Sequence, residues 1–381
     1  MPYCSTLEAT HSAARRGQPM RYVDEFRDSA AAARLVERIH RRPLVPVNLM
    51  EVCGTHTVAI FRHGIRQLLP DHVTLVSGPG CPVCVTANRD VDWAIALAHQ
   101  PRTILATFGD MMKVPGSTSS LARARAEGCD VRVVYSTLDA LAIARANPDR
   151  RVVFFGIGFE TTAPTVACSI LEAEQNGLDN YFVYSVHKVM PPPMKALVDA
   201  EEIRIDGFIC PGHVSAIIGS EPYRFLAADY GIPCVIAGFE PLDVLQAVDM
   251  LLAMRAEGRA GVEIQYSRVV RPEGNPLARE QMYRVFQPSD AEWRGLGNIP
   301  GSGLEIREEY AHFDARRAFD IDPGPTREHA GCRCGEVLRG VVEPPQCPLY
   351  GRVCTPENPV GPCMVSSEGT CSTWFQFAGV E

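Results

Sequence analysis

Short apolar runs alternate with helix-like segments from residue 45 to about residue 260 of this 381-residue chain. The runs are continuous and rich in β-branched and aromatic residues, which is typical of strands buried on both faces of a parallel sheet. They predict strands at residues 45–51, 72–77, 103–107, 131–135, 151–156, 181–186, 206–210 and 233–237. The apolar spacing between them predicts helices near residues 56–69, 89–99, 119–127, 138–147, 161–176, 192–202, 213–219 and 240–257.

This alternation indicates an α/β fold with two doubly wound, Rossmann-like parallel-sheet lobes that face each other across a cleft. We expect residues 41–145 to form the first lobe and residues 146–260 the second, with the boundary near Asn147-Pro148-Asp149. A single eight-stranded sheet or barrel is the alternative.

The rest of the chain has a different composition. Residues 286–381 are rich in Gly, Pro and Cys and contain few long periodic runs. Such a segment cannot build a large core and usually needs a covalent or metal staple. We therefore expect residues 261–381 to form a small Cys-rich domain on which residues 1–40 pack, including an amphipathic helix at about 22–40.

Composition and charge exclude several classes of function. The formal net charge is −8 with both signs interspersed, so no basic patch indicates nucleic acid. No apolar run approaches the ~20 residues of a membrane span, and the first residues lack the apolar stretch of a signal peptide. Without an export signal, the 14 cysteines should be mostly reduced in the cytoplasm. Metal binding or redox catalysis explains them better than a disulfide framework.

The Cys81-x-x-Cys84 pair stands in the sequence Gly-Pro-Gly-Cys-Pro-Val-Cys, directly after a predicted strand. The glycines and prolines of this stretch predict a stiff turn that holds two sulfurs in a set geometry. Two thiols at this spacing can close a disulfide, bind a soft metal or shift each other's pKa. A buried structural Cys pair is the other interpretation.

Further polar motifs also follow predicted strands. They contain Cys53-Gly-Thr-His56, Asp110, Glu160, Ser185-Val-His187-Lys188 and His213. Sites in open parallel sheets lie outside the carboxyl ends of the strands, so we expect these motifs to converge.

Cys53 and His56 offer a thiolate and an imidazole, which together suit a transition metal. A helix that begins at Thr55 would lower the pKa of the Cys53 thiol. The alternative is a buried Cys at a strand end, a capping Thr and a surface His. Asp110, Glu160 and Lys113 could be proton donors, partner ligands or turn residues. Taken singly, His187 and His213 are expected to be structural.

Four cysteines of the tail are spaced C-x14-C-x6-C-x16-C, at Cys332, Cys347, Cys354 and Cys371. Four thiolates bind either a tetrahedral zinc ion or an iron–sulfur cluster. The spacing leaves both metals open. Cys334 and Cys363 are two extra thiols, and the C-x-C at 332–334 makes the first ligand ambiguous.

Four motifs and the four-cysteine tail carry a resemblance to a known family. The motifs are Cys53-Gly-Thr-His, Gly-Pro-Gly-Cys81-Pro-Val-Cys84, Gly158-Phe-Glu-Thr-Thr and Pro211-Gly-His213-Val-Ser. Together they resemble the HypD family, the maturation proteins of [NiFe]-hydrogenases. The resemblance spans residues 51 to 371. It implies two α/β lobes and a third domain with a [4Fe-4S] cluster. It also implies assembly of an Fe(CN)2(CO) group, as transient cargo, in a complex with the chaperone HypC. Cyanide would come from HypE, working with HypF.

The resemblance also implies residue roles. Cys53 would hold the iron jointly with a chaperone cysteine, with His56 as second ligand or proton partner. Cys81 and Cys84 would be a redox pair, and Asp110, Glu160 and His213 would line the cleft. The cluster ligands would be Cys332, Cys347, Cys354 and Cys371, with Glu368 nearby.

Two other functions remain open from the residues themselves. A ferredoxin-linked disulfide reductase would also use a cluster beside a Cys-x-x-Cys loop, but it has no obvious need for Cys53-Gly-Thr-His56. A zinc-stapled binding protein would use both Cys clusters structurally. A nucleotide-binding fold is disfavoured, because Gly156-x-Gly158 lacks its third glycine and no P-loop occurs.

Overall fold

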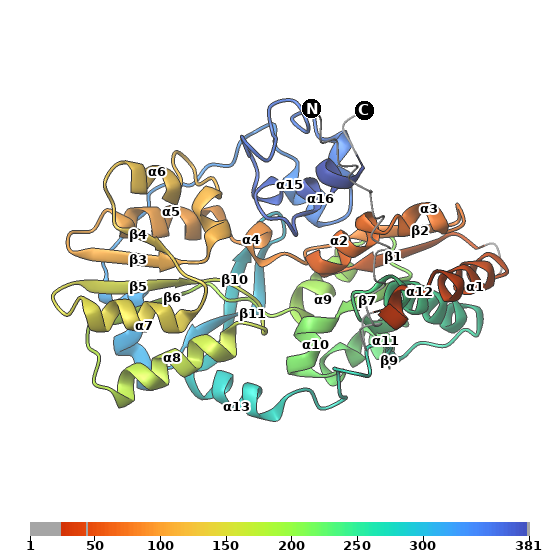
Figure 1. Ribbon diagram of the computed structural model, residues 1–381, viewed down its shortest axis with the longest axis horizontal. Helices are drawn as coiled ribbons and strands as arrows, with labels where there is room; N and C mark the ends of the chain where they lie inside the picture. Colours follow the sequence, from red (N-terminus) through yellow and green to blue (C-terminus); the bar gives the residue numbers. More distant parts are fainter. Residues whose placement is uncertain (1–23, 43–44, 379–381) are drawn as a thin grey trace, which may run out of the picture.

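The computed structural model describes residues 24–42 and 45–378, which form two parallel-sheet lobes with a Cys-rich segment between them (Figure 1). One sheet has the strand order β2-β1-β7-β8-β9 and the other the order β4-β3-β5-β6. We call the parts built on them the β1 lobe and the β3 lobe. The expected α/β fold with two parallel-sheet lobes is thereby confirmed.

The sheet of the β1 lobe consists of β1 (Val47–Glu51), β2 (Val73–Ser77), β7 (Gly207–Pro211), β8 (Cys234–Ala237) and β9 (Val262–Ile264). Strand residues alternate between two faces, as the period of a strand requires. Leu49 faces a core formed with α1 (Ser29–His40), α2 (Gly54–Arg62), α3 (Ile65–Leu68) and α12 (Pro241–Ala256). Met50 faces the core that contains α9 (Pro191–Asp199), α10 (Gly212–Ile218) and α11 (Arg224–Tyr230).

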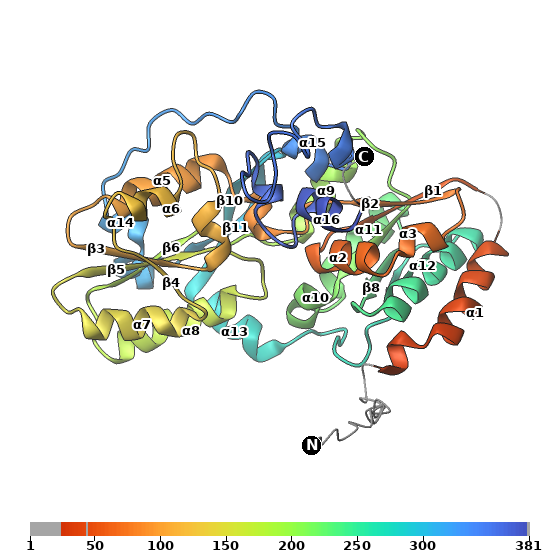
Figure 2. The same ribbon diagram turned by 45° about the horizontal axis from the view of Figure 1, so that its top comes forward.

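The sheet of the β3 lobe consists of β3 (Thr103–Thr107), β4 (Val131–Val133), β5 (Arg151–Gly156) and β6 (Tyr181–Ser185). Figures 1 and 2 show α5 (Asn88–Ala98) and α6 (Leu121–Ala126) on one face of this sheet, and α7 (Thr137–Ala146) and α8 (Ala163–Gln175) on the other. Val153 and Phe155 point to the first face, and Val152 and Phe154 to the second. Both lobes are therefore doubly wound, as expected.

All eight strands predicted from the apolar runs exist, with ends shifted by two residues at most. The predicted helix at 56–69 is interrupted, because Gly64 adopts the left-handed conformation with φ of 61° and ends α2 before α3 begins. None of the helices in the described residues is long and apolar enough to cross a membrane.

The predicted division of the chain between the lobes is wrong. β3 and β4 precede residue 145 but pair with β5 and β6, while β7 and β8 return to pair beside β1. Sequence periodicity identifies a buried strand but does not specify its neighbour, since pairing is decided by contacts distant in sequence. The β3 lobe is thus inserted between two halves of the β1 lobe.

The expectation of one C-terminal domain over residues 261–381 is also wrong. β9 joins the edge of the β1 lobe, and α13 (Pro276–Val285) packs on α8 of the β3 lobe. β10 (Phe286–Trp293) and β11 (Gly297–Ile306) form an antiparallel hairpin that lies between the lobes in Figure 1, followed by α14 (Ala315–Ala318). The Cys-rich segment itself holds α15 (Cys334–Leu338) and α16 (Thr370–Phe377).

The N-terminal helix does not pack on the Cys-rich segment. The predicted helix at 22–40 appears as a short 3-10 turn, Asp24–Arg27, and α1, and both lie against α12 of the β1 lobe. Leu35 and Ile39 enter the core of that lobe, so the apolar face of α1 is covered there. Residues 1–23 of the prediction lie outside the described part of the chain.

Candidate thiol site

The two sheets place their polar loops at the points where the strand order reverses. In the β1 lobe this point lies between β1 and β7, which are followed by Cys53 and His213. In the β3 lobe it lies between β3 and β5, which are followed by Asp110 and Glu160. Ligands of doubly wound proteins bind at such switch points, so the topology gives these loops the expected position for a site.

Cys53 caps the N-terminus of α2 and is buried. Its N–H donates to Oε2 of Glu51 at 3.0 Å. Burial raises the pKa of the Cys53 thiol to about 12, with further upward contributions from the carboxylates of Glu368 and Glu51. The backbone N–H groups of His56 and Thr55 act in the opposite direction. The predicted lowering of this pKa by the helix start is therefore wrong, because burial outweighs it.

Glu51 is a candidate residue that the sequence reasoning missed. It is 1% exposed, and its Oε1 accepts a hydrogen bond from Oγ1 of Thr57 at 2.5 Å. Burial raises the pKa of Glu51 to about 7, although hydrogen bonds from Thr57, Ser77 and the Cys53 N–H oppose the shift. A carboxylate at the end of an otherwise apolar strand was the signal available in the sequence.

His56 is fully buried in the first turn of α2. Its Nε2 lies 3.2 Å from the Ala237 carbonyl and 3.0 Å from that of Gly238, so Nε2 carries the proton. Nδ1 has no hydrogen-bond partner among the described residues. Burial lowers the pKa of His56 to about 4, which leaves a neutral imidazole with a free lone pair on Nδ1. That state is the one a metal requires.

His213 and His56 both pack against the same aromatic ring. Its ring stacks on Phe239 at a centroid distance of 4.0 Å, and the His56 ring lies 4.7 Å from the same Phe239. Burial lowers the pKa of His213, and the carboxylate of Glu368 opposes the shift. The adjacency of β1, β7 and β8 thus brings His213 to the Cys53 loop, although the sequence had assigned it to the other lobe.

The Gly78–Cys84 loop packs directly on Cys53. The Gly54 N–H donates to the Gly80 carbonyl at 3.1 Å, and a Cβ at Gly80 would lie 2.2 Å from the Cys53 nitrogen. Only glycine permits this approach. The loop continues into α4 (Pro82–Val85), where Sγ of Cys81 accepts a hydrogen bond from the Cys84 N–H at 3.4 Å.

Cys84 connects this loop to the Cys-rich segment. Its Sγ lies 3.9 Å from the Pro362 carbonyl, and the thiols of Cys84 and Cys363 interact. Cys363 in turn has its Sγ 2.7 Å from that of Cys334 and also interacts with the Cys371 thiol. Burial raises the pKa of Cys84 well above its usual value. Cys334 and Cys363, the two extra thiols of the tail, therefore lie between the Cys-x-x-Cys pair and the four predicted cluster ligands.

All six cysteines of the tail line one small cavity, together with Val337, Leu349, Tyr350, Gly361 and Met364. The four predicted cluster ligands are among them, which the sequence spacing alone could not show. In the described ranges no three His, Cys, Asp or Glu side chains are grouped so that they could hold a single metal ion as they stand. The donor set is nevertheless purely thiol in an apolar wall, which suits an iron–sulfur cluster.

A chain of hydrogen bonds joins the two lobes across the Cys-rich segment. Oδ2 of Asp110 accepts from Oγ of Ser366 at 3.0 Å, and that Oγ accepts from the Glu368 N–H at 3.3 Å. Oε1 of Glu368 accepts from Oγ1 of Thr55 at 2.6 Å. Asp110 is thus tied to the loop that carries Cys53.

Glu160 does not belong to this chain of hydrogen bonds. It is 1% exposed, and its Oε1 accepts from the Met190 N–H at 3.0 Å, while Oε2 has no partner among the described residues. Burial raises the pKa of Glu160 to about 7. Gly158, which precedes it, has φ of 142°, so the turn that buries this carboxyl group needs a glycine.

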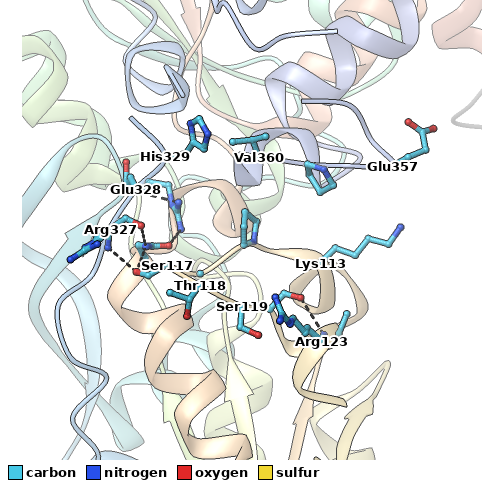
Figure 3. A pocket seen from close by; sticks show the side chains of 17 residues that line it. Lys113, Ser117, Thr118, Ser119, Arg123, Arg327, Glu328, His329, Glu357 and Val360 are labelled. Carbon is cyan, nitrogen blue, oxygen red and sulfur yellow. Dashed lines mark hydrogen bonds and ion pairs between the residues drawn. The ribbon is translucent and has the colours of Figure 1, made fainter. Parts of the chain in front are cut away.

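A cavity of about 590 Å³ lies between the loop of residues 113–123 and residues 327–329 and 357–360 (Figure 3). Its wall carries Lys113, Arg123, Arg294 and Arg327, together with Glu328. The cavity borders the tail cysteines, because the Val360 N–H lies 3.3 Å from Sγ of Cys354. It does not contain Cys53 or His56.

Comparisons with known proteins match most of the chain to one family. The family model HypD, described as the hydrogenase formation hypA family, matches residues 30–378. The hydrogenase expression/formation protein HupD of Azotobacter chroococcum mcd 1 is 50% identical over 367 residues, which cover 94% of this chain and 97% of that protein. The hydrogenase maturation factor HypD of Escherichia coli (strain K12) is 45% identical over 366 residues, 94% and 98% of the two chains. The chain therefore belongs to the HypD family of hydrogenase maturation factors.

Proposed function

We propose that this protein is the scaffold and redox component on which the Fe(CN)2(CO) group of [NiFe]-hydrogenases is assembled. The observation that carries the proposal is the packing of three thiol-bearing segments on one another. The Gly78–Cys84 loop packs on the backbone of the Cys53 loop, and its Cys84 interacts with Cys363, which leads to Cys334 and the cavity of the tail. A disulfide reductase would use the Gly78–Cys84 loop and the tail but not the Cys53 loop.

Cys53 and His56 are the proposed ligands of the iron, which is the substrate. The soft sulfur of Cys53 suits low-spin iron with strong-field ligands, and the free Nδ1 of His56 offers a second donor. A thiol with a pKa near 12 holds its proton until a metal displaces it. Glu51, whose pKa is about 7 and which accepts from the Cys53 N–H, is placed to take that proton. A cysteine of a HypC-type chaperone would complete the iron site.

Cys81 and Cys84 are the proposed electron donors for cyanide release. The cyanide donor would be a thiocyanate on HypE, made with HypF. Reduction of this thiocyanate by two thiols yields a thiol, hydrogen cyanide and a Cys81–Cys84 disulfide, so that two electrons and the protons balance. Both sulfurs are buried beside the Cys53 loop, which would keep the released cyanide close to the iron.

Cys332, Cys347, Cys354 and Cys371 are the proposed ligands of a resident [4Fe-4S] cluster. When bound, such a cluster supplies single electrons at low potential. The thiols of Cys334 and Cys363 separate this ligand set from Cys84. All cysteines in the described residues are free, which fits a protein of the reducing cytoplasm.

The first test is iron, acid-labile sulfide and zinc analysis of the anaerobically purified protein, with a visible spectrum. We expect about four irons and four sulfides per chain and broad visible absorption. One zinc without sulfide would remove the electron source and would favour a structural binding protein.

A second test separates the iron site from the cluster. Cys53→Ala should abolish retention of the assembled iron group in a complex with the chaperone, detected by infrared bands of bound cyanide and carbon monoxide. The cluster absorption should be unchanged in the same sample. Simultaneous loss of both signals would mean that Cys53 is structural.

A further inference from the structure

Lys188 is a buried cation whose ammonium has no hydrogen-bonded or ion-paired partner in the described part of the chain. Its side chain is 3% exposed. The ammonium makes a cation–π contact with Trp293, whose ring centroid is 5.7 Å from Nζ. The backbone is fixed, since the Lys188 N–H donates to the Gly158 carbonyl at 3.0 Å. A buried charge of this kind costs free energy unless something pairs with it.

This lysine lines a cavity of about 500 Å³ that is separate from the thiol site. Trp93 and Tyr184, whose ring centroids are 4.1 Å apart, and Ser185 at the end of β6 also line the cavity. So do His187, Arg89 and Arg316. The Tyr184 hydroxyl donates to Asp90 at 2.9 Å, and Arg316 donates to the same carboxylate at 3.1 Å. The Asp90 carboxylate therefore already accepts two hydrogen bonds and does not bond to Lys188.

The part of the cavity wall formed by the β10–β11 hairpin is acidic. Asp290, Glu292 and Glu305 are exposed on the β10–β11 hairpin and line the cavity. Glu292 makes no hydrogen bond or ion pair within residues 24–42 and 45–378, although its charge acts on Lys188. A ligand that fits both parts of the wall needs an anionic oxygen for the buried ammonium and a cationic group for the exposed carboxylates.

We propose that this cavity binds a small zwitterion, a molecule of the amino-acid class whose carboxylate pairs with Nζ of Lys188 and whose cationic group faces Glu292 and its neighbours. Trp93 and Tyr184 provide flat apolar surface for the carbon atoms between the two charges. Burial lowers the pKa of Lys188, with Arg316 acting in the same direction and Asp90 and Glu292 opposing it. A bound carboxylate would raise the pKa of Lys188 again, which gives a direct signal of occupancy.

The composition of the chain makes this signal easy to isolate, because Lys113, Lys188 and Lys195 are its only lysines. The full-length protein, purified anaerobically with its native metal content, is labelled with ¹³C at lysine Cε. Arginine is the probe; agmatine, which lacks the carboxylate, and acetate, which lacks the cation, are the matched controls. We expect arginine to shift the Lys188 signal and raise its titration midpoint, while the two exposed lysines stay unchanged.

Two variants extend the test by calorimetric titration with arginine. Lys188→Met should weaken binding about ten- to a hundred-fold, since it removes a charge-assisted hydrogen bond. Glu292→Gln should weaken it by a few-fold, because an exposed charge contributes less. The proposal is overturned if arginine leaves the Lys188 signal of the wild-type protein unchanged, or if agmatine or acetate alone reproduces its effect. Unaltered arginine affinity of Lys188→Met would overturn it as well.

Discussion

The carboxyl group of Glu160 shows how burial alone changes the chemistry of a residue. One of its oxygens accepts from the Met190 N–H, and the other has no partner among the described residues. With desolvation as the largest cause, its pKa rises from 4.5 to about 7. The native state therefore binds the proton more tightly than the unfolded chain does.

We predict that this proton makes stability pH-dependent. Below pH 4.5 the group is protonated in both states and costs nothing; as the pH rises to 7 the unfolded chain ionises first, and stability is lost. A difference of about 2.5 pH units corresponds to about 3 kcal/mol. In Glu160→Gln the loss measured by urea unfolding between pH 4.5 and 7.5 should shrink by this amount, while the contribution of Glu51, whose pKa is also about 7, remains. Glu174→Gln, an exposed change on α8, is the control and should retain the wild-type dependence.

A second prediction concerns the two extra thiols. Cys363 contacts Cys84, Cys334 and Cys371 without belonging to the predicted ligand set. Cys363→Ala should leave about four irons and four sulfides per chain but stop hydrogenase maturation, measured by activity in cells that lack the native protein. Cys347→Ala, the matched ligand variant, should lose the iron itself. Loss of iron in Cys363→Ala would show that this cysteine is a ligand and that the ligand set is wrong.

The sequence predicts which thiols form the candidate site but not their environment. The spacing of the cysteines and the Cys-Gly-Thr-His motif single out Cys53, His56, Cys81 and Cys84 as candidates. It could not predict that Glu51 lies against Cys53, or that burial outweighs the helix start in setting the thiol pKa. Both depend on how completely water is excluded, which only tertiary packing decides.

At the scale of elements, the contact between two loops fixes the position of Cys53. The Gly78–Cys84 loop crosses so close to the start of α2 that a Cβ at Gly80 would lie 2.4 Å from the Cys53 Cα. Both sides of the contact are backbone, so no side chain can move away to relieve it.

We therefore predict that Gly80→Ala separates the two loops. The unfolding free energy should fall by about 1–3 kcal/mol, as for other overpacked sites, and iron retention with the chaperone should fall with it. Gly109→Ala is the control, because its Cβ would meet only Val133 Cγ1, at 3.6 Å. Its unfolding free energy should change by no more than about 0.5 kcal/mol, and its iron retention should equal that of the wild type within the error of the assay. Normal stability and iron retention in Gly80→Ala would mean that the loop contact is not needed for the site.

The elements themselves were largely predictable, because the eight apolar runs are short and continuous. The regions without such runs were not. β9 has three half-buried residues, and the β10–β11 hairpin alternates buried and exposed positions among prolines and glycines. Their stability comes from the lobes on which they pack rather than from a local pattern.

At the scale of the whole molecule, the chain passes from the β1 lobe to the β3 lobe and back. This path places both strand-order reversals next to the Cys-rich segment, which forms hydrogen bonds with the residues that follow β1, β2 and β3. Sequence alone did not predict this, since each buried run is compatible with either sheet. The site therefore depends on contacts that join the lobes.

One such contact can be measured directly. Asp110 follows β3, and Ser366 belongs to the Cys-rich segment, which reaches Cys53 through Glu368 and Thr55. We predict that Asp110→Ala and Ser366→Ala are coupled by about 1 kcal/mol in a double-mutant cycle of unfolding free energies, the usual net value of a hydrogen bond. Both variants should keep the cluster absorption.

A further variant, Asp110→Asn, distinguishes a hydrogen bond that only stabilises the contact between the lobes from a role of Asp110 in the iron site. If the bond only holds the lobes together, Asp110→Asn, which can still accept from Ser366, should restore stability and iron retention together. If the carboxylate itself acts on the iron group, the amide should restore stability but not retention in the chaperone complex. Because Ser366 also accepts from the Glu368 N–H, we expect the first outcome, and additive single variants would refute the coupling between the lobes.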